Sequence, residues 1–103
     1  MELVETAVFT RQAEAAFSPD EYRALQLHII LRPDAGDIIP GSGGLRKLRW
    51  HGSGRGKRGG IRIIYYWKSM TNRLFLLYMY PKNVRATLSP VQLRELRKLV
   101  GDE

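Results

Sequence analysis

The residues with the clearest chemical potential in this sequence are lysines and arginines gathered in its middle. Residues 38–94 contain no aspartate or glutamate, whereas they contain twelve lysine or arginine residues. A surface that serves only solubility normally mixes charges of both signs, so this segregation predicts a polyanionic partner. Nucleic acid is the first candidate. An acidic protein, an anionic membrane and a compositional bias without function are the alternatives.

A strand predicted over residues 45–51 would carry part of this charge. Successive side chains of a strand point to opposite faces, so Leu45, Lys47 and Arg49 share one face. Arg46 lies on the other face with two apolar residues, and it is also a candidate contact for RNA. We therefore predict one packed face and one cationic face.

The glycine-rich segment 52–60 follows, with Arg55, Lys57 and Arg58 between its glycines. Glycines allow the backbone to approach a phosphate chain, and the cations would neutralise it. The segment lacks the spacing of a nucleotide-binding P-loop, so nucleotide hydrolysis is not expected. A plain hairpin loop kept soluble by its charges is the alternative.

Arg62 interrupts the apolar run of a strand predicted over residues 61–68. Removing a cation from water is costly unless it is paired or faces a groove. An ion pair with Glu2, Glu5 or Glu14 would be a purely structural explanation, and a contact with a phosphate is the functional one.

The missing acids and cysteines also limit the chemistry. Paired-carboxylate and two-metal mechanisms need Asp or Glu at the site, and the chain has no cysteine and only two histidines. Attack of an RNA 2'-hydroxyl on its own 3'-phosphate needs only alignment, charge stabilisation and proton transfer, which Arg, Lys, Tyr or His can provide. His28 is expected to pack, and His51 beside the basic segment remains a candidate.

The rest of the pattern predicts one α+β domain over residues 1–103, in the order β-α-α-β-β-β-α. We expect a strand over residues 3–9, a short helix over 10–17 and a helix that Ser18 caps and Pro33 stops. Its predicted apolar side consists of Tyr22, Leu25, Ile29 and Leu31. Residues 33–44 read as a loop.

Three strands in succession, over residues 45–51, 61–68 and 73–80, predict an antiparallel meander. Ser89 and Pro90 open a last helix, whose predicted apolar stripe consists of Leu93, Leu96, Leu99 and Val100. The two N-terminal helices are expected on one face of a small, mostly antiparallel sheet. The acidic N-terminus and the absence of a long apolar stretch predict a soluble, cytoplasmic protein without contact to membranes.

Three segments resemble the RelE/ParE superfamily of bacterial toxins. They are Leu45-Arg-Lys-Leu-Arg49, Gly56-Lys-Arg-Gly-Gly-Ile-Arg-Ile-Ile-Tyr-Tyr66 and Tyr78-Met-Tyr-Pro-Lys-Asn83. The middle segment is similar to the HigB-type toxins of the RelE branch. The resemblance implies an mRNA interferase that enters the ribosomal A site, cuts translated message without a metal or cofactor, and is silenced by a cognate antitoxin.

The resemblance also implies site residues. Lys47 and Arg49 match basic residues of the family's second strand, Arg62 matches its third-strand arginine, and Lys82 with Asn83 matches the polar end of its fourth strand. The C-terminal tyrosine of some relatives has no counterpart here. The proton acceptor therefore stays open among Lys47, Arg49, Lys57, Tyr80 and His51, and Tyr80 is also an expected RNA contact. A non-enzymatic ParE-type toxin that binds gyrase, or a plain RNA-binding module, is the alternative.

Overall fold

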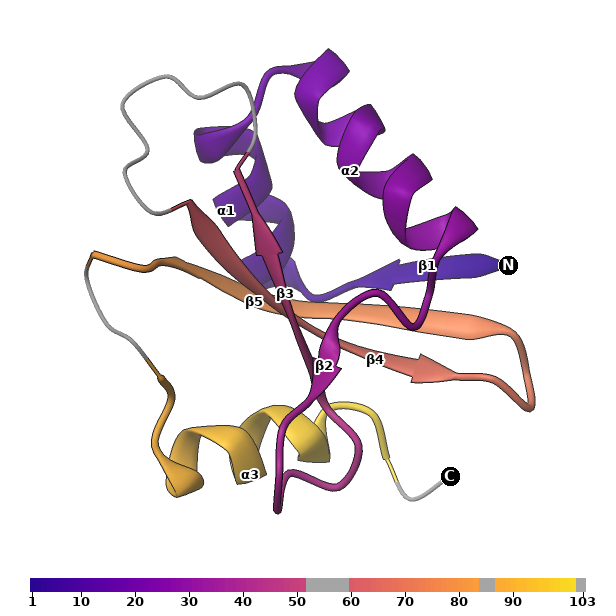
Figure 1. Cartoon of the computed structure of the whole chain (residues 1–103), viewed down its shortest axis with the longest axis vertical. Coiled ribbons are helices and arrows are strands. Elements are labelled where there is room, and N and C mark those ends of the chain that lie inside the picture. The colour runs from indigo at the N-terminus through magenta and orange to yellow at the C-terminus, as the bar shows by residue number, and fades with distance from the viewer. Residues whose placement is uncertain (52–59, 84–86, 102–103) are drawn as a thin grey trace.

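The protein is a five-stranded mixed sheet with helices on both faces, seen in a computed structural model that describes residues 1–51, 60–83 and 87–101 (Figure 1). The elements in chain order are β1 (Glu2–Glu5), α1 (Ala7–Ala16), α2 (Pro19–Leu31), β2 (Asp37–Ile38), β3 (Arg46–Trp50), β4 (Ile61–Lys68), β5 (Arg73–Pro81) and α3 (Pro90–Lys98). The strand order across the sheet is β1-β5-β4-β3-β2. The predicted α+β fold is confirmed.

The three central strands form the predicted antiparallel meander. β3 pairs with β4 and β4 with β5, both antiparallel. β1 lies at the edge of the sheet beside β5 and runs parallel to it, with Glu5 opposite Leu76. Parallel neighbours need a long connection, and the segment from α1 to β4 provides it. The predicted loop over 33–44 contains one further short strand, β2, which pairs with β3.

The first strand is shorter and the first helix longer than predicted. β1 ends at Glu5, and α1 starts at Ala7, inside the predicted strand over 3–9. Thr6 is the reason, since its Oγ1 accepts a hydrogen bond from the amide of Phe9 at 3.0 Å and donates one to the carbonyl of Leu77 at 2.9 Å. The cap turns the chain into a helix and ties that turn to β5.

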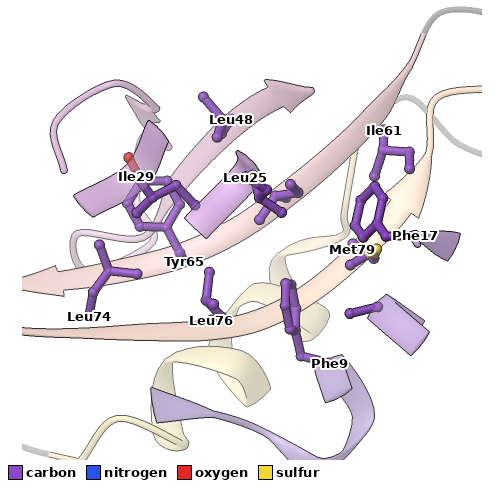
Figure 2. Packing of buried hydrophobic residues seen from close by; sticks show 12 residues of the cluster. Phe9, Phe17, Leu25, Ile29, Leu48, Ile61, Tyr65, Leu74, Leu76 and Met79 are labelled. Atoms are coloured by element: carbon purple, nitrogen blue, oxygen red, sulfur yellow. The ribbon is translucent and has the colours of Figure 1, made fainter. Parts of the chain in front are cut away.

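Helices α1 and α2 cover one face of the sheet and enclose the larger core (Figure 2). Phe9, Leu25 and Ile29 pack there against Tyr65 and other residues of β3 to β5. Leu31 was expected on the inner side of α2, but 76% of its surface is exposed, because the buried side of the helix is set by Leu25 and Ile29. None of the described helices is long and apolar enough to span a bilayer.

Helix α3 covers part of the opposite face (Figure 1). A smaller core forms there around Leu45, Ile64 and Leu77, with Leu93 and Leu96 of α3 against it. Val100 is buried as expected, whereas Leu99 is 58% exposed because it lies past the last turn of the helix on the outer side. Ser18 and Ser89 begin α2 and α3 as predicted, and each forms a capping box, with Glu21 and Gln92 respectively.

Candidate nucleic-acid interface

Three of the predicted site residues lie in one row across three neighbouring strands. The register sets Arg49 of β3 opposite Arg62 of β4, and Arg62 opposite Tyr80 of β5. Directly opposite residues of adjacent strands point to the same face. Ile61 and Ile63, on either side of Arg62, belong to the core beneath α1 and α2. The row therefore lies on the other face, which carries α3.

Lys47 lies on the same face as the row. It is opposite Ile64 of β4, which in turn is opposite Tyr78 of β5. Ile64 belongs to the α3-side core, which fixes the orientation of this second row. Lys47 is half-buried, whereas Arg49 is exposed. The predicted cationic face of β3 is thus present, with Leu45 at its end buried under α3.

Arg62 and Tyr80 form the buried part of the row. Arg62 has 6% of its surface exposed and Tyr80 4%. The two carboxylates of β1 that were considered as structural partners of Arg62 bind elsewhere: Glu2 accepts from Arg73 Nε at 3.0 Å, and Glu5 accepts from Thr10 and Tyr22. Arg62 is thus buried in the sheet directly opposite the exposed Arg49.

The ends of the same three strands meet beside the row. The backbone N–H of Lys82 donates to the carbonyl of Gly60 at 3.2 Å. Gly60 has a φ of +75°, and a Cβ there would lie 2.8 Å from the Trp50 carbonyl oxygen and 3.0 Å from His51 Nδ1. Only glycine fits this close approach without strain. The contacts of Gly60 place His51 and Lys82 at one end of the sheet, and Asn83 follows Lys82 in the turn.

The other predicted residues are not all brought to this surface. Arg46 points to the opposite face, where its Nη1 donates to the carbonyls of Gly36 at 2.7 Å and Asp34 at 3.3 Å. Arg55, Lys57 and Arg58 lie outside the described residues. His28 packs its ring against Trp50 with a centroid distance of 5.3 Å, in line with the expected packing role.

Half-buried Tyr78 extends the aromatic side chains from buried Tyr80 toward α3. The rings of Tyr78 and Tyr80 are tilted against each other with centroids 6.4 Å apart. From the sequence, Tyr80 is a candidate site residue and Tyr78 is not, although both belong to the segment that resembles the family. The alternation along β5 that puts Tyr78 and Tyr80 on one face was the available signal.

The chemical character of this surface is cationic and aromatic. Among residues 1–51, 60–83 and 87–101, no three His, Cys, Asp or Glu side chains are grouped so that they could hold a metal ion. Guanidinium and ammonium groups bind phosphate oxygens and stabilise charge that develops on them. Tyrosine rings stack on bases. The arrangement suits a single-stranded nucleic acid better than a small neutral ligand.

Comparison with protein families assigns the chain to a group. The family described as the RelE toxin of the RelE/RelB toxin–antitoxin system matches residues 6–102. The chain belongs to the RelE toxin family. In this RelE-family toxin the match begins at Thr6, the cap of α1, and extends through α3, so it contains the whole row Arg49, Arg62 and Tyr80.

Proposed function

We propose that this RelE-family toxin is a ribosome-dependent endoribonuclease of the HigB-like kind. It binds in the ribosomal A site, cleaves the translated message there and so inhibits translation in the cytoplasm. The reaction is attack of a 2'-hydroxyl on the adjacent 3'-phosphate and requires no metal or other cofactor. A cognate antitoxin protein holds the toxin silent.

The row Arg49, Arg62 and Tyr80 is the observation that supports this proposal. In the reaction the 2'-oxygen forms a bond to phosphorus and the bond from phosphorus to the 5'-oxygen breaks. The transition state gathers negative charge on the phosphorane oxygens, and preorganised cations stabilise that charge most strongly where water is excluded. A buried arginine beside an exposed one supplies such a fixed arrangement.

Two protons must also move. The 2'-hydroxyl gives up its proton, and the departing 5'-oxygen gains one, so the products are a 2',3'-cyclic phosphate and a 5'-hydroxyl. Lys47 lies on the same face as the row, Tyr80 belongs to the row, and His51 and Lys82 lie at the end of the sheet next to it. Lys57 belongs to the basic segment that joins β3 and β4 in the sequence. We assign proton transfer to this group and phosphate binding to Arg49, Arg62 and the basic segment, with Asn83 as a further RNA contact.

A ParE-type toxin that binds gyrase without cleaving anything, or an RNA-binding module, could use the same sheet. The cation-rich, acid-free block favours the nuclease, because a toxin that blocks a protein has less need of uninterrupted positive charge. Neither alternative requires a buried arginine in the middle of the cationic face.

Primer extension on a defined message, with and without translating ribosomes, tests the proposal. We expect toxin-dependent cuts inside codons only when the message is translated, with a cyclic phosphate on the upstream fragment. Cuts on naked RNA alone would contradict the dependence on the ribosome. Complete absence of cuts, with loss of gyrase activity or simple RNA retention instead, would support the alternatives.

A further inference from the structure

A small apolar pocket lies between α3 and β5, next to the row. Its volume is about 260 Å³, and its lining consists of Tyr78, Leu88, Val91, Gln92, Glu95 and Leu96. Tyr78 is the link to the row, because its ring lies 6.4 Å from that of Tyr80. A ligand held in this pocket would therefore lie close to any phosphate bound at Arg49 and Arg62.

We propose that this pocket binds one base of the cleaved message and selects guanine through the Glu95 carboxylate. The inference rests on the proposed function and adds to it the source of base preference. The residues involved do not belong to the cationic row, so binding of the base and cleavage of the phosphate can be separated by substitution.

The shape and lining of the pocket suit a nucleobase. Its volume is smaller than that of pockets for drug-sized ligands, which favours a single flat ring system. Leu88, Val91 and Leu96 supply apolar walls from α3 and the segment before it, and Tyr78 supplies an aromatic one. Stacking on a tyrosine ring accepts any base, so the lining alone provides affinity without choice.

Glu95 provides the selectivity among bases. It is the only carboxylate between residues 38 and 101. A carboxylate beside bound RNA repels phosphate, and it is tolerated where it meets hydrogen-bond donors of a base. Its Oε2 accepts from Lys98 Nζ at 2.9 Å, and the side chain of Glu95 is 65% exposed at the edge of the pocket. An ionised carboxylate accepts hydrogen bonds and donates none, so it needs a base that presents donors.

This donor requirement separates the four bases. Guanine presents two adjacent donors, N1–H and the N2 amino group, which match the two oxygens of a carboxylate. Adenine and cytosine each present one amino group, and uracil presents one N–H between two carbonyls that a carboxylate repels. A good bidentate contact discriminates by about tenfold or more. We therefore expect guanine first and uracil last.

The experiment uses translating ribosomes and a message whose A-site codon is varied through the four bases at each position in turn. For the wild-type toxin, we expect cleavage at one position to be about tenfold faster with guanine than with uracil. Glu95→Gln should bring these two rates close together while cleavage at the best codon persists. Tyr78→Leu should slow cleavage of all codons, and Tyr78→Phe should preserve it because the ring remains.

Asp20→Asn is the matched control. Asp20 forms an exposed i,i+3 ion pair with Arg23 on α2, as Glu95 does with Lys98 on α3, but α2 covers the other face of the sheet. The Asp20→Asn variant should show the same base preference as the wild type. An unchanged preference in Glu95→Gln would overturn the inference and leave the proposed function intact.

Two further results distinguish the remaining explanations. A wild-type toxin that cuts no translated message would overturn the proposed function itself. If Val91→Glu left cleavage and base preference unchanged but prevented neutralisation by the antitoxin encoded beside the toxin, the pocket would be a protein-docking site and the inference would be wrong.

Discussion

Arg49 of β3 and Arg62 of β4 stand directly opposite each other on adjacent antiparallel strands and point to the same face of the sheet. Like charges in directly opposite positions destabilise a sheet. A pair of arginines in this place therefore lowers stability relative to an uncharged pair. Binding of a polyanion reverses the effect, because a phosphate between the two groups is attracted by both.

Replacing Arg49 by threonine should therefore stabilise the protein and weaken its activity. The exposed position tolerates a β-branched residue, and loss of the repulsion should raise the free energy of unfolding by about 0.2–1 kcal/mol. Denaturant unfolding measures the first effect and the primer-extension assay the second. A variant that is less stable than the wild type, or equally active, would contradict this interpretation of the pair.

Replacing Arg62 should affect cleavage more than folding. Loss of one preorganised charge contact with a transition state costs about 100-fold or more in rate. We expect Arg62→Ala to lose toxicity and Arg62→Lys to recover part of it, since lysine keeps the charge without the planar donors of arginine. Circular dichroism establishes whether each variant is folded. A folded Arg62→Ala variant that arrests growth like the wild type would exclude Arg62 from the site.

Removal of the Tyr65 hydroxyl should lower the stability of the protein more than removal of any other hydroxyl. Its ring is fully buried, and its OH donates to the Pro33 carbonyl at 2.7 Å and accepts from the Gly36 amide at 2.8 Å. Tyr65→Phe leaves two backbone groups without this partner, which should lower the free energy of unfolding by about 1–3 kcal/mol.

Tyr66→Phe is the control for that measurement. Tyr66 follows Tyr65 on β4, and its ring lies 4.6 Å from the guanidinium carbon of Arg97, a contact that phenylalanine retains. Its effect on stability should be small. If both variants lost the same stability, the hydroxyl of Tyr65 would have no special role in fixing the segment before β2.

Tyr22 should make stability depend on alkaline pH. Burial, and next the hydrogen bond to Glu5, raise the pKa of Tyr22 above its ordinary value. The folded protein therefore favours the neutral phenol, and this contribution is complete below the ordinary tyrosine pKa of about 10 and is lost as the pH rises toward the folded-state value. Tyr22→Phe should lose less stability than the wild type between about pH 9 and about pH 11. Urea unfolding at the two pH values measures this, and equal losses would contradict it.

Much of the fold could be predicted because local signals and tertiary packing agree. The capping residues Ser18 and Ser89 identify two helices. The alternation in residues 45–51 and the apolar run in residues 61–68 identify two strands of the meander. The same alternation put Lys47 and Arg49 on one face. The row with Arg62 and Tyr80 depends in addition on the register of β3, β4 and β5, which a single strand does not contain.

The differences arise where distant contacts override local preference. Val8 and Phe9 favour a strand by type, but the Thr6 cap and the burial of Phe9 in the core make them part of α1. β2 has only two residues and exists because it pairs with β3. The register between β4 and β5 shifts at a bulge between Ile64 and Tyr65, so that Ile64 lies opposite Tyr78 but Tyr65 lies opposite Leu76. This bulge has no signal in the sequence.

The central claim is that cleavage proceeds through the message's own 2'-hydroxyl on a surface of cations. The most direct measurement is cleavage, on translating ribosomes, of a message that carries a single 2'-deoxy residue at the scissile position. Because only one oxygen is missing, binding should persist, and we expect no cleavage at that site while an all-ribose message is cut. Cleavage of the deoxy message at an undiminished rate would require an external water nucleophile and would contradict the mechanism.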